Sequence, residues 1–142
     1  MFHTSPTEIA PGSINKFGIA GSCLFFSDSV YKMTASKTVF VYQANFSCID
    51  VSQLHDDAAI SEIADYFGVN LDVAEALLDG SENEWDHGTD ADGSWWLQGK
   101  RGECAVKMGY DGCKDRDEQG VVYIIPMLGR ESELSLIEVC HE

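Results

Sequence analysis

The distribution of apolar periodicity along the chain most constrains what it can fold into. Between residues 60 and 78, apolar residues recur at the spacing that lines one face of an α-helix. The two sets are Ile60, Ile63, Ala64 and Phe67, followed by Leu71, Ala74, Leu77 and Leu78. A glycine follows each set, at Gly68 and Gly80, as is typical of helix C-termini. Two short amphipathic helices are therefore predicted in the middle of the chain.

Strand-like patterns lie on both sides of these helices. Residues 38–46 are rich in β-branched and aromatic residues, which favours a strand. The other predicted strands are 1–5, 112–117, 120–126 and 134–140, with further helices at 30–35 and 94–108 and an exposed acidic loop at 81–94. Strands at both ends with helices clustered between them predict an α+β fold.

Length and composition favour one globular domain over residues 1–142. The chain is 44% hydrophobic, which is enough for a packed core. It contains no apolar run of the roughly 18 residues that cross a membrane, and it shows no secretory signal pattern. Its five cysteines form no CxxC pair and no cluster with histidine that suits zinc. We expect reduced thiols and a cytosolic protein.

The formal net charge is −15, from 24 acidic and 9 basic residues. Such a balance disfavours direct binding to nucleic acid or to an anionic membrane, because phosphate groups would be repelled. It favours association with a basic protein surface, such as one that binds DNA. An acidic surface that serves only solubility explains the charge equally well.

Three segments carry groups that suit chemistry. The opening segment His3-Thr4-Ser5 can donate and accept several hydrogen bonds at a strand end, although an ordinary strand histidine is the alternative. The second segment offers the rings of Phe25, Phe26 and Tyr31 beside the small polar residue Ser27, and its alternative is a pair of core aromatics.

The third segment is the carboxylate cluster Asp115-Arg116-Asp117-Glu118. A carboxylate beside a sugar can stabilise the positive charge that develops when a glycosidic bond breaks. On a strand, Asp115 and Asp117 would point to one face and Glu118 to the other. The alternative is a solvated turn before Gly120.

In this order the three segments resemble the NAD-binding segments of mono-ADP-ribosyltransferases. The resemblance covers most of the chain and is greatest to the phage-encoded anti-CRISPR members that inhibit type I-F systems. The pieces that carry it are Phe2-His3, Ser5, Glu8-Ile9, Val73 to Ala76, Leu97-Gln98, Arg101-Gly102, Ala105 to Lys107, Gly109-Tyr110, Asp117-Glu118 and Gly120.

The resemblance implies two small, mostly antiparallel sheets that form an NAD cleft with flanking helices. It implies that Asp117 is catalytic, and that the cofactor is bound by His3, Thr4, Ser5, Phe25, Phe26, Ser27, Tyr31 and Glu118. The implied partner is a protein, a subunit of a type I CRISPR effector with a basic DNA-binding surface, in the host bacterial cytosol. No metal, direct nucleic-acid or membrane partner is implied.

Two other functions stay open on the residues alone. A non-enzymatic inhibitor could use the acidic surface as a mimic of nucleic acid and occlude a basic groove. Such a protein acts at one copy per target, whereas an enzyme inactivates an excess of target and needs NAD. A toxin of the same fold that modifies other host proteins is the third reading.

Overall fold

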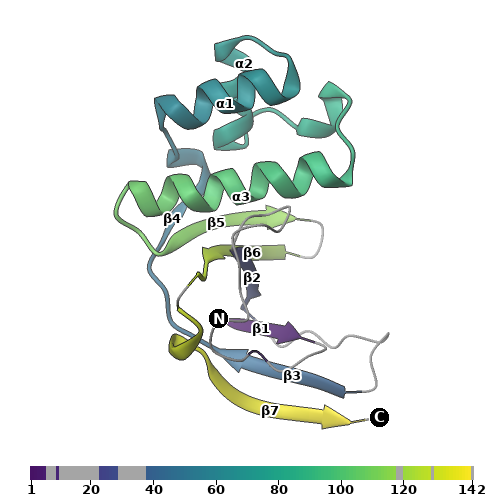
Figure 1. Ribbon diagram of the computed structural model, residues 1–142, viewed down its shortest axis with the longest axis vertical. Helices are drawn as coiled ribbons and strands as arrows, with labels where there is room; N and C mark the ends of the chain where they lie inside the picture. The colour runs from purple at the N-terminus through teal and green to yellow at the C-terminus, as the bar shows by residue number, and fades with distance from the viewer. Residues whose placement is uncertain (6–8, 10–22, 29–37, 118–119, 129, 142) are drawn as a thin grey trace.

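The computed structural model describes the chain except for residues 6–8, 10–22, 29–37, 118–119, 129 and 142. It is a mixed α+β structure in which helices cover one part of a sheet (Figure 1). The strands are β1 (Phe2–Ser5), β2 (Cys23–Ser27), β3 (Thr38–Gln43), β4 (Cys48–Asp50), β5 (Gly112–Asp117), β6 (Gly120–Pro126) and β7 (Ser135–His141). The α-helices are α1 (Asp57–Phe67), α2 (Leu71–Asp79) and α3 (Ala91–Lys107). Short 3-10 helices are η1 (Val51–Gln53), η2 (Glu84–His87) and η3 (Glu131–Glu133).

The seven strands form one sheet in the order β4-β5-β6-β2-β1-β3-β7. All neighbours pair antiparallel except β4 and β5, which are parallel. The prediction of two separate sheets is therefore wrong for the described residues. The reason lies between β2 and β1, where the register joins Phe2 to Ser27 and makes the two halves one sheet.

Both faces of β6 are buried, so one strand serves two cores. Ile124 packs with the helices, whereas its neighbour Ile125 packs on the opposite face with Phe26 and Met127. Successive strand residues point to opposite faces of a sheet, and this alternation separates the two cores. The fully apolar run in this strand is the pattern expected where both faces are covered.

Helix α3 lies between the sheet and the other two helices (Figure 1). Its buried residues Leu97, Cys104 and Ala105 face the same core as Leu77 and Leu78 of α2. Asp90 caps the helix, because its side chain accepts a hydrogen bond of 2.8 Å from the backbone N–H of Gly93. Helix α3 therefore begins three residues earlier than the predicted 94–108.

The glycine at the start of β5 allows a close approach between backbones. A Cβ atom on Gly112 would lie 2.2 Å from the carbonyl oxygen of Ile124 and 2.6 Å from Cδ1 of Ile125. No larger residue fits without moving β6. Gly112 thereby helps to set where β5, and Asp117 at its end, lies against the sheet.

Candidate functional site

Strands β1 and β2 bring two of the predicted segments together. His3 Nδ1 lies 2.7 Å from the backbone carbonyl oxygen of Phe25, and its ring lies 5.4 Å from the ring of Phe26 between centroids. A carbonyl oxygen only accepts, so Nδ1 donates and Nε2 keeps its lone pair. Burial lowers the pKa of His3 from its ordinary value, and the hydrogen bond to Phe25 only partly opposes that shift.

The other predicted residues of these strands differ in their surroundings. Ser5 is buried, and Thr4 lies opposite Val41 of β3. Phe26 is 1% exposed and belongs to the core on the face away from the helices. Phe25, on the opposite face of β2, is only partly buried. Of the two phenylalanines, Phe25 lines the smaller of the two cavities described below.

The carboxylate segment ends strand β5. Asp117 lies opposite Gly120 of β6 in the register of the sheet. Its side chain lies outside the described residues, as do Tyr31 and Glu118. The side chains described at this end of β5 are those of Asp115 and Arg116.

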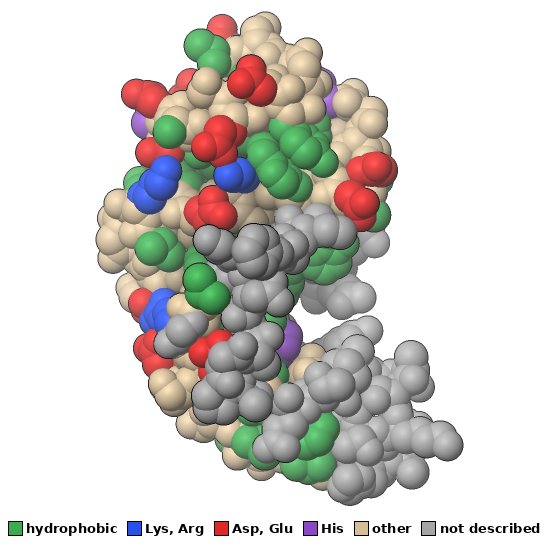
Figure 2. Space-filling model, in the orientation of Figure 1, with side chains coloured by type: hydrophobic (Ala, Val, Ile, Leu, Met, Phe, Trp, Pro, Cys, Tyr) green, Lys and Arg blue, Asp and Glu red, His purple; other side chains and the backbone are tan. Residues whose placement is uncertain are grey.

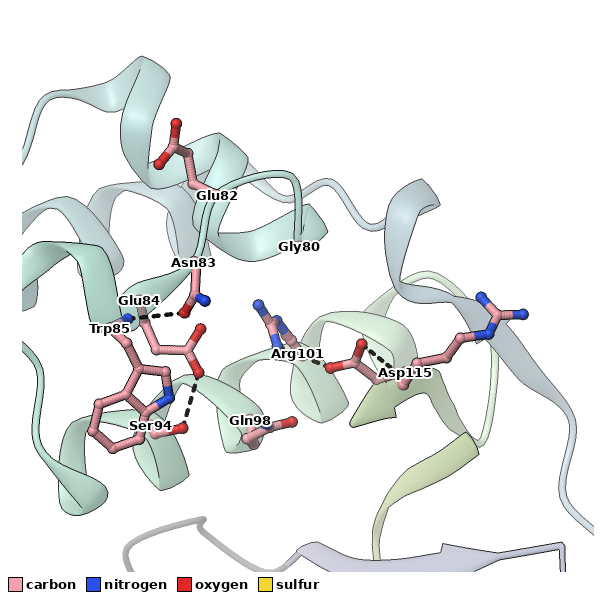
Figure 3. A pocket seen from close by; sticks show the side chains of 10 residues that line it. Gly80, Glu82, Asn83, Glu84, Trp85, Ser94, Gln98, Arg101 and Asp115 are labelled. Atoms are coloured by element: carbon pink, nitrogen blue, oxygen red, sulfur yellow. Dashed lines mark hydrogen bonds and ion pairs between the residues drawn. The ribbon is translucent and has the colours of Figure 1, made fainter. Parts of the chain in front are cut away.

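A groove runs from the aromatic residue of β2, past the end of β5, to η2. It consists of two adjoining cavities of about 570 Å³ and 340 Å³. Five residues line both of them: Trp85, Ser94, Gln98, Asp115 and Arg116. Figure 3 shows the larger cavity, with side chains from η2, α3 and β5 converging on it.

The smaller cavity is the apolar end of the groove. Phe25, Trp95 and Val122 line it together with Asp115 and Arg116. The rings of Phe25 and Trp95 meet edge to face, with centroids 4.9 Å apart and planes at 73°. This cavity joins a predicted cofactor-binding residue to the two residues directly before Asp117. His3 is absent from the described lining of either cavity.

A buried ion pair between Arg101 and Asp115 holds the part of the groove where the two cavities adjoin. Arg101 is 4% exposed, and its Nη1 atom donates to Asp115 Oδ2 at 3.0 Å. The same guanidinium donates to the carbonyl oxygens of Leu77 at 2.7 Å and Leu78 at 3.3 Å. Arg101 thus ties α3 to β5 and to the end of α2, and its charge is neutralised by Asp115 (Figure 3).

The larger cavity carries acceptors without a cationic partner. Glu84 is 8% exposed and accepts a hydrogen bond of 2.9 Å from Ser94 Oγ. Among the residues that the structure describes, no Lys, Arg or His lies within ion-pair distance of Glu84. Gln98 Oε1 is buried and has no hydrogen-bond partner in the part of the chain that the structure describes. Trp85, which is 56% exposed, forms an aromatic wall beside them.

Sequence reasoning missed this half of the groove because it predicted an exposed loop over residues 81–94. That prediction is wrong for η2, where Glu84 is buried, and for the first turn of α3. Asn83 could have indicated a short helix, since its side chain accepts a hydrogen bond of 3.0 Å from the backbone N–H of Trp85. Two tryptophans in an acidic stretch, Trp85 and Trp95, were a second unused signal.

The described cysteines are free thiols with poor nucleophilicity. Cys23, Cys48, Cys104 and Cys113 form no disulfide. Burial raises the pKa of Cys23 to about 12 and that of Cys48 to about 11, so both are protonated near neutral pH. Within the described part of the chain, no group of three or more His, Cys, Asp or Glu residues could hold a metal ion.

Comparisons with known proteins gave a likeness to a solved structure. No family model and no curated protein matches this chain. A solved structure described as "Crystal structure of an anti-CRISPR protein" matches with a TM-score of 0.55 and 25% sequence identity. The match covers 99% of this chain and 93% of that one. Among the described residues, no helix is both long and apolar enough to cross a membrane.

Proposed function

We propose that this chain is an anti-CRISPR protein that transfers ADP-ribose from NAD to a subunit of a type I CRISPR effector. The anti-CRISPR part rests on the likeness to a solved anti-CRISPR protein, which extends over nearly the whole of both chains. The enzymatic part rests on the groove and on the resemblance of the three segments to mono-ADP-ribosyltransferases. The target is then a protein of the CRISPR system in the bacterial host.

The observation that carries the enzymatic proposal is the apolar end of the groove. Phe25 and Arg116 are 91 positions apart in sequence and line the same cavity. The resemblance assigns one segment to cofactor binding and the other, through Asp117, to catalysis. Their meeting in one cavity is what a transferase of this kind requires.

The residues of this end fit the planar part of the cofactor. Phe25 and Trp95 offer aromatic surface, and the cavity of about 340 Å³ is lined mostly by apolar and aromatic side chains. Arg116 is exposed at the same place and can attract phosphate oxygens. When bound, NAD supplies the ADP-ribosyl group, with nicotinamide as the leaving group.

The chain's own residues then have distinct roles. Phe25 and Trp95 would hold the ring of the leaving group and exclude water from it. His3 would offer its Nε2 lone pair to a ribose hydroxyl. Asp117 would stabilise the positive charge that develops on the ribose as the bond to nicotinamide breaks.

A second candidate function is supported by the distribution of charge. Residues 38–99 contain 13 of the 24 acidic residues and none of the nine Lys and Arg residues. A surface of this kind could occupy a basic DNA-binding groove without chemistry. Occlusion of this type needs neither NAD nor Asp117. Dependence on NAD and on Asp117 therefore distinguishes the two functions.

The test is transfer of label from NAD to a purified type I CRISPR effector. Asp117→Asn is expected to lower the rate at least about 100-fold, because it removes the charge that stabilises the ribose. Asp65→Asn is the matched control, since Asp65 is an exposed aspartate on α1, away from the groove. Equal transfer by Asp117→Asn and the wild type would refute the catalytic role, and no transfer by the wild type would refute the transferase.

A further inference from the structure

We infer that the polar end of the groove binds an arginine side chain of the protein that is modified. This inference rests on the proposed function for the identity of its partner, and it assigns the cavity of about 570 Å³ lined by Glu82, Glu84, Trp85 and Gln98. The ligand class is a guanidinium on an extended or looped segment of the target.

The charges in this cavity oppose a phosphate. Arg101 is already neutralised by Asp115 and two carbonyl oxygens. Arg116, which also lines this cavity, is exposed to solvent. Glu84 has no cationic partner among the described residues, and its carboxylate would repel the pyrophosphate of a dinucleotide, whereas Glu82 Oε2 lies 3.2 Å from His87 Nε2. The polar end therefore suits a cation.

The unfilled acceptors match the donors of a guanidinium. Glu84 is 8% exposed and accepts from Ser94 Oγ, and within the described part of the chain no donor reaches the buried Oε1 of Gln98. A buried acceptor without a donor is costly, and a ligand that donates to it removes that cost. Arginine carries five N–H donors in a planar fork, more than any other side chain.

An aromatic wall completes the site. Trp85 is 56% exposed and Trp95 is 46% exposed, and both line the groove. A guanidinium stacks well on an indole face, where the cation is attracted to the ring. Figure 3 shows Trp85 beside Glu84 and Ser94, so a planar cation at Trp85 would lie within reach of the carboxylate.

The polar cavity adjoins the apolar end of the groove, where the proposed transfer takes place. The cavity is continuous with the apolar end through Ser94, Gln98 and Asp115. An arginine held there would place the neighbouring residues of the target beside the end of β5. The site would thus select a basic segment of the target and present it to Asp117.

The surrounding surface supports a basic partner. Figure 2 shows acidic side chains spread over the helical layer on the visible face. Helices α1 and α2 carry no Lys or Arg, whereas α3 carries Lys100, Arg101 and Lys107. Such a field raises the rate at which a basic surface approaches, and the cavity then fixes where it binds.

The direct test is a titration with a capped tripeptide that has a central arginine, without NAD. Nuclear magnetic resonance of the ¹⁵N-labelled protein follows the indole N–H signals of Trp85 and Trp95 and the side-chain amide of Gln98. We expect saturable shifts of these signals with a Kd of about 1 mM. The same peptide with citrulline, a neutral isostere, is expected to bind at least about tenfold more weakly.

Variants locate the binding. Glu84→Gln is expected to raise the peptide Kd about tenfold, whereas Glu75→Gln, which removes an exposed charge of α2 outside the groove, leaves it unchanged. Trp85→Leu is the second variant, because an exposed side chain is not needed for folding. It is expected to raise the Kd several-fold.

Several outcomes overturn the inference: no shift at the groove, equal binding of the citrulline peptide, or equal weakening by Glu75→Gln. Because the titration contains no NAD, it is separate from the transferase proposal. A protein that binds the arginine peptide in the groove but transfers nothing would refute the proposed function and support the site.

Discussion

The hydrogen bond from His3 to the Phe25 carbonyl defines the chemistry of that histidine. It fixes the proton on Nδ1 and orients the ring beside Phe26. Because burial lowers the pKa of His3, the neutral form is favoured in the folded protein. A neutral ring with its lone pair on Nε2 is the form that can accept a hydrogen bond from a ribose hydroxyl.

This pKa shift has a consequence for stability. The unfolded chain binds a proton at His3 near the ordinary value of 6.5, whereas the folded chain resists protonation until lower pH. The stabilisation is therefore complete above pH 6.5 and is lost as the pH falls from there toward the folded pKa. As the pH falls from about 7.5 to about 5.5, the free energy of unfolding measured by chemical denaturation is expected to fall more in the wild type than in His3→Asn. Parallel pH profiles of the two proteins would contradict this assignment.

The sequence predicted which segments contribute to the site more reliably than which side chain of a segment reaches it. Phe25 and Phe26 were equivalent candidates, because both faces of β2 are covered and no apolar–polar alternation distinguishes them. The structure sends Phe26 into the core and Phe25 to the groove. Trp85 and Gln98 were missed because their role arises from contacts between elements that are far apart in sequence.

At the scale of elements, Arg101 links three of them. Its side chain bonds Asp115 of β5 and the last turns of α2 from its position on α3. Removal of one partner from a buried ion pair leaves the other charge uncompensated, which is more costly than loss of the pair as a whole.

Arg101→Met is accordingly expected to lower the free energy of unfolding by about 3 to 5 kcal/mol. The double variant Arg101→Met, Asp115→Leu is expected to regain more than half of that loss, since no charge is then left buried. Lys100→Met removes the adjacent, more exposed charge and is expected to cost about 1 kcal/mol or less. Denaturant unfolding measures all three, and equal losses in Arg101→Met and Lys100→Met would count against a structural ion pair.

The elements that sequence predicted best are those with a strong local signal. Helices α1 and α2 have clear apolar faces and end at the left-handed glycines Gly68 and Gly80. Strand β4 was missed because three residues, Cys48–Asp50, are too few to show alternation. Its place beside β5 comes from a parallel pairing between segments more than 60 residues apart, which no local pattern encodes.

At the scale of the whole molecule, the sheet order explains how distant segments form one site. Strands β5, β6 and β2 are neighbours in the sheet. The carboxylate segment at the end of β5 therefore lies near β2, although the two are about 90 residues apart in sequence. Helix α3 lies beside β5 in Figure 1, and residues of α3 and η2 line the groove together with residues of this part of the sheet. An α+β class was predictable from the order of elements, but the single continuous sheet was not, because it depends on the contact between β1 and β2.

The net charge of −15 belongs to this scale as well. It suits both an enzyme that seeks a basic target and a protein that occludes one. The two differ in what happens to the target, since only the enzyme changes it covalently and then leaves.

The intact mass of the effector subunits is the most direct test of the central claim. An excess of a type I CRISPR effector is incubated with NAD and a substoichiometric amount of this protein. We predict that every copy of one subunit gains the mass of one ADP-ribose group, and that this gain is lost without NAD. Unchanged subunit masses, with inhibition only when the protein equals the effector in amount, would contradict the account and establish occlusion.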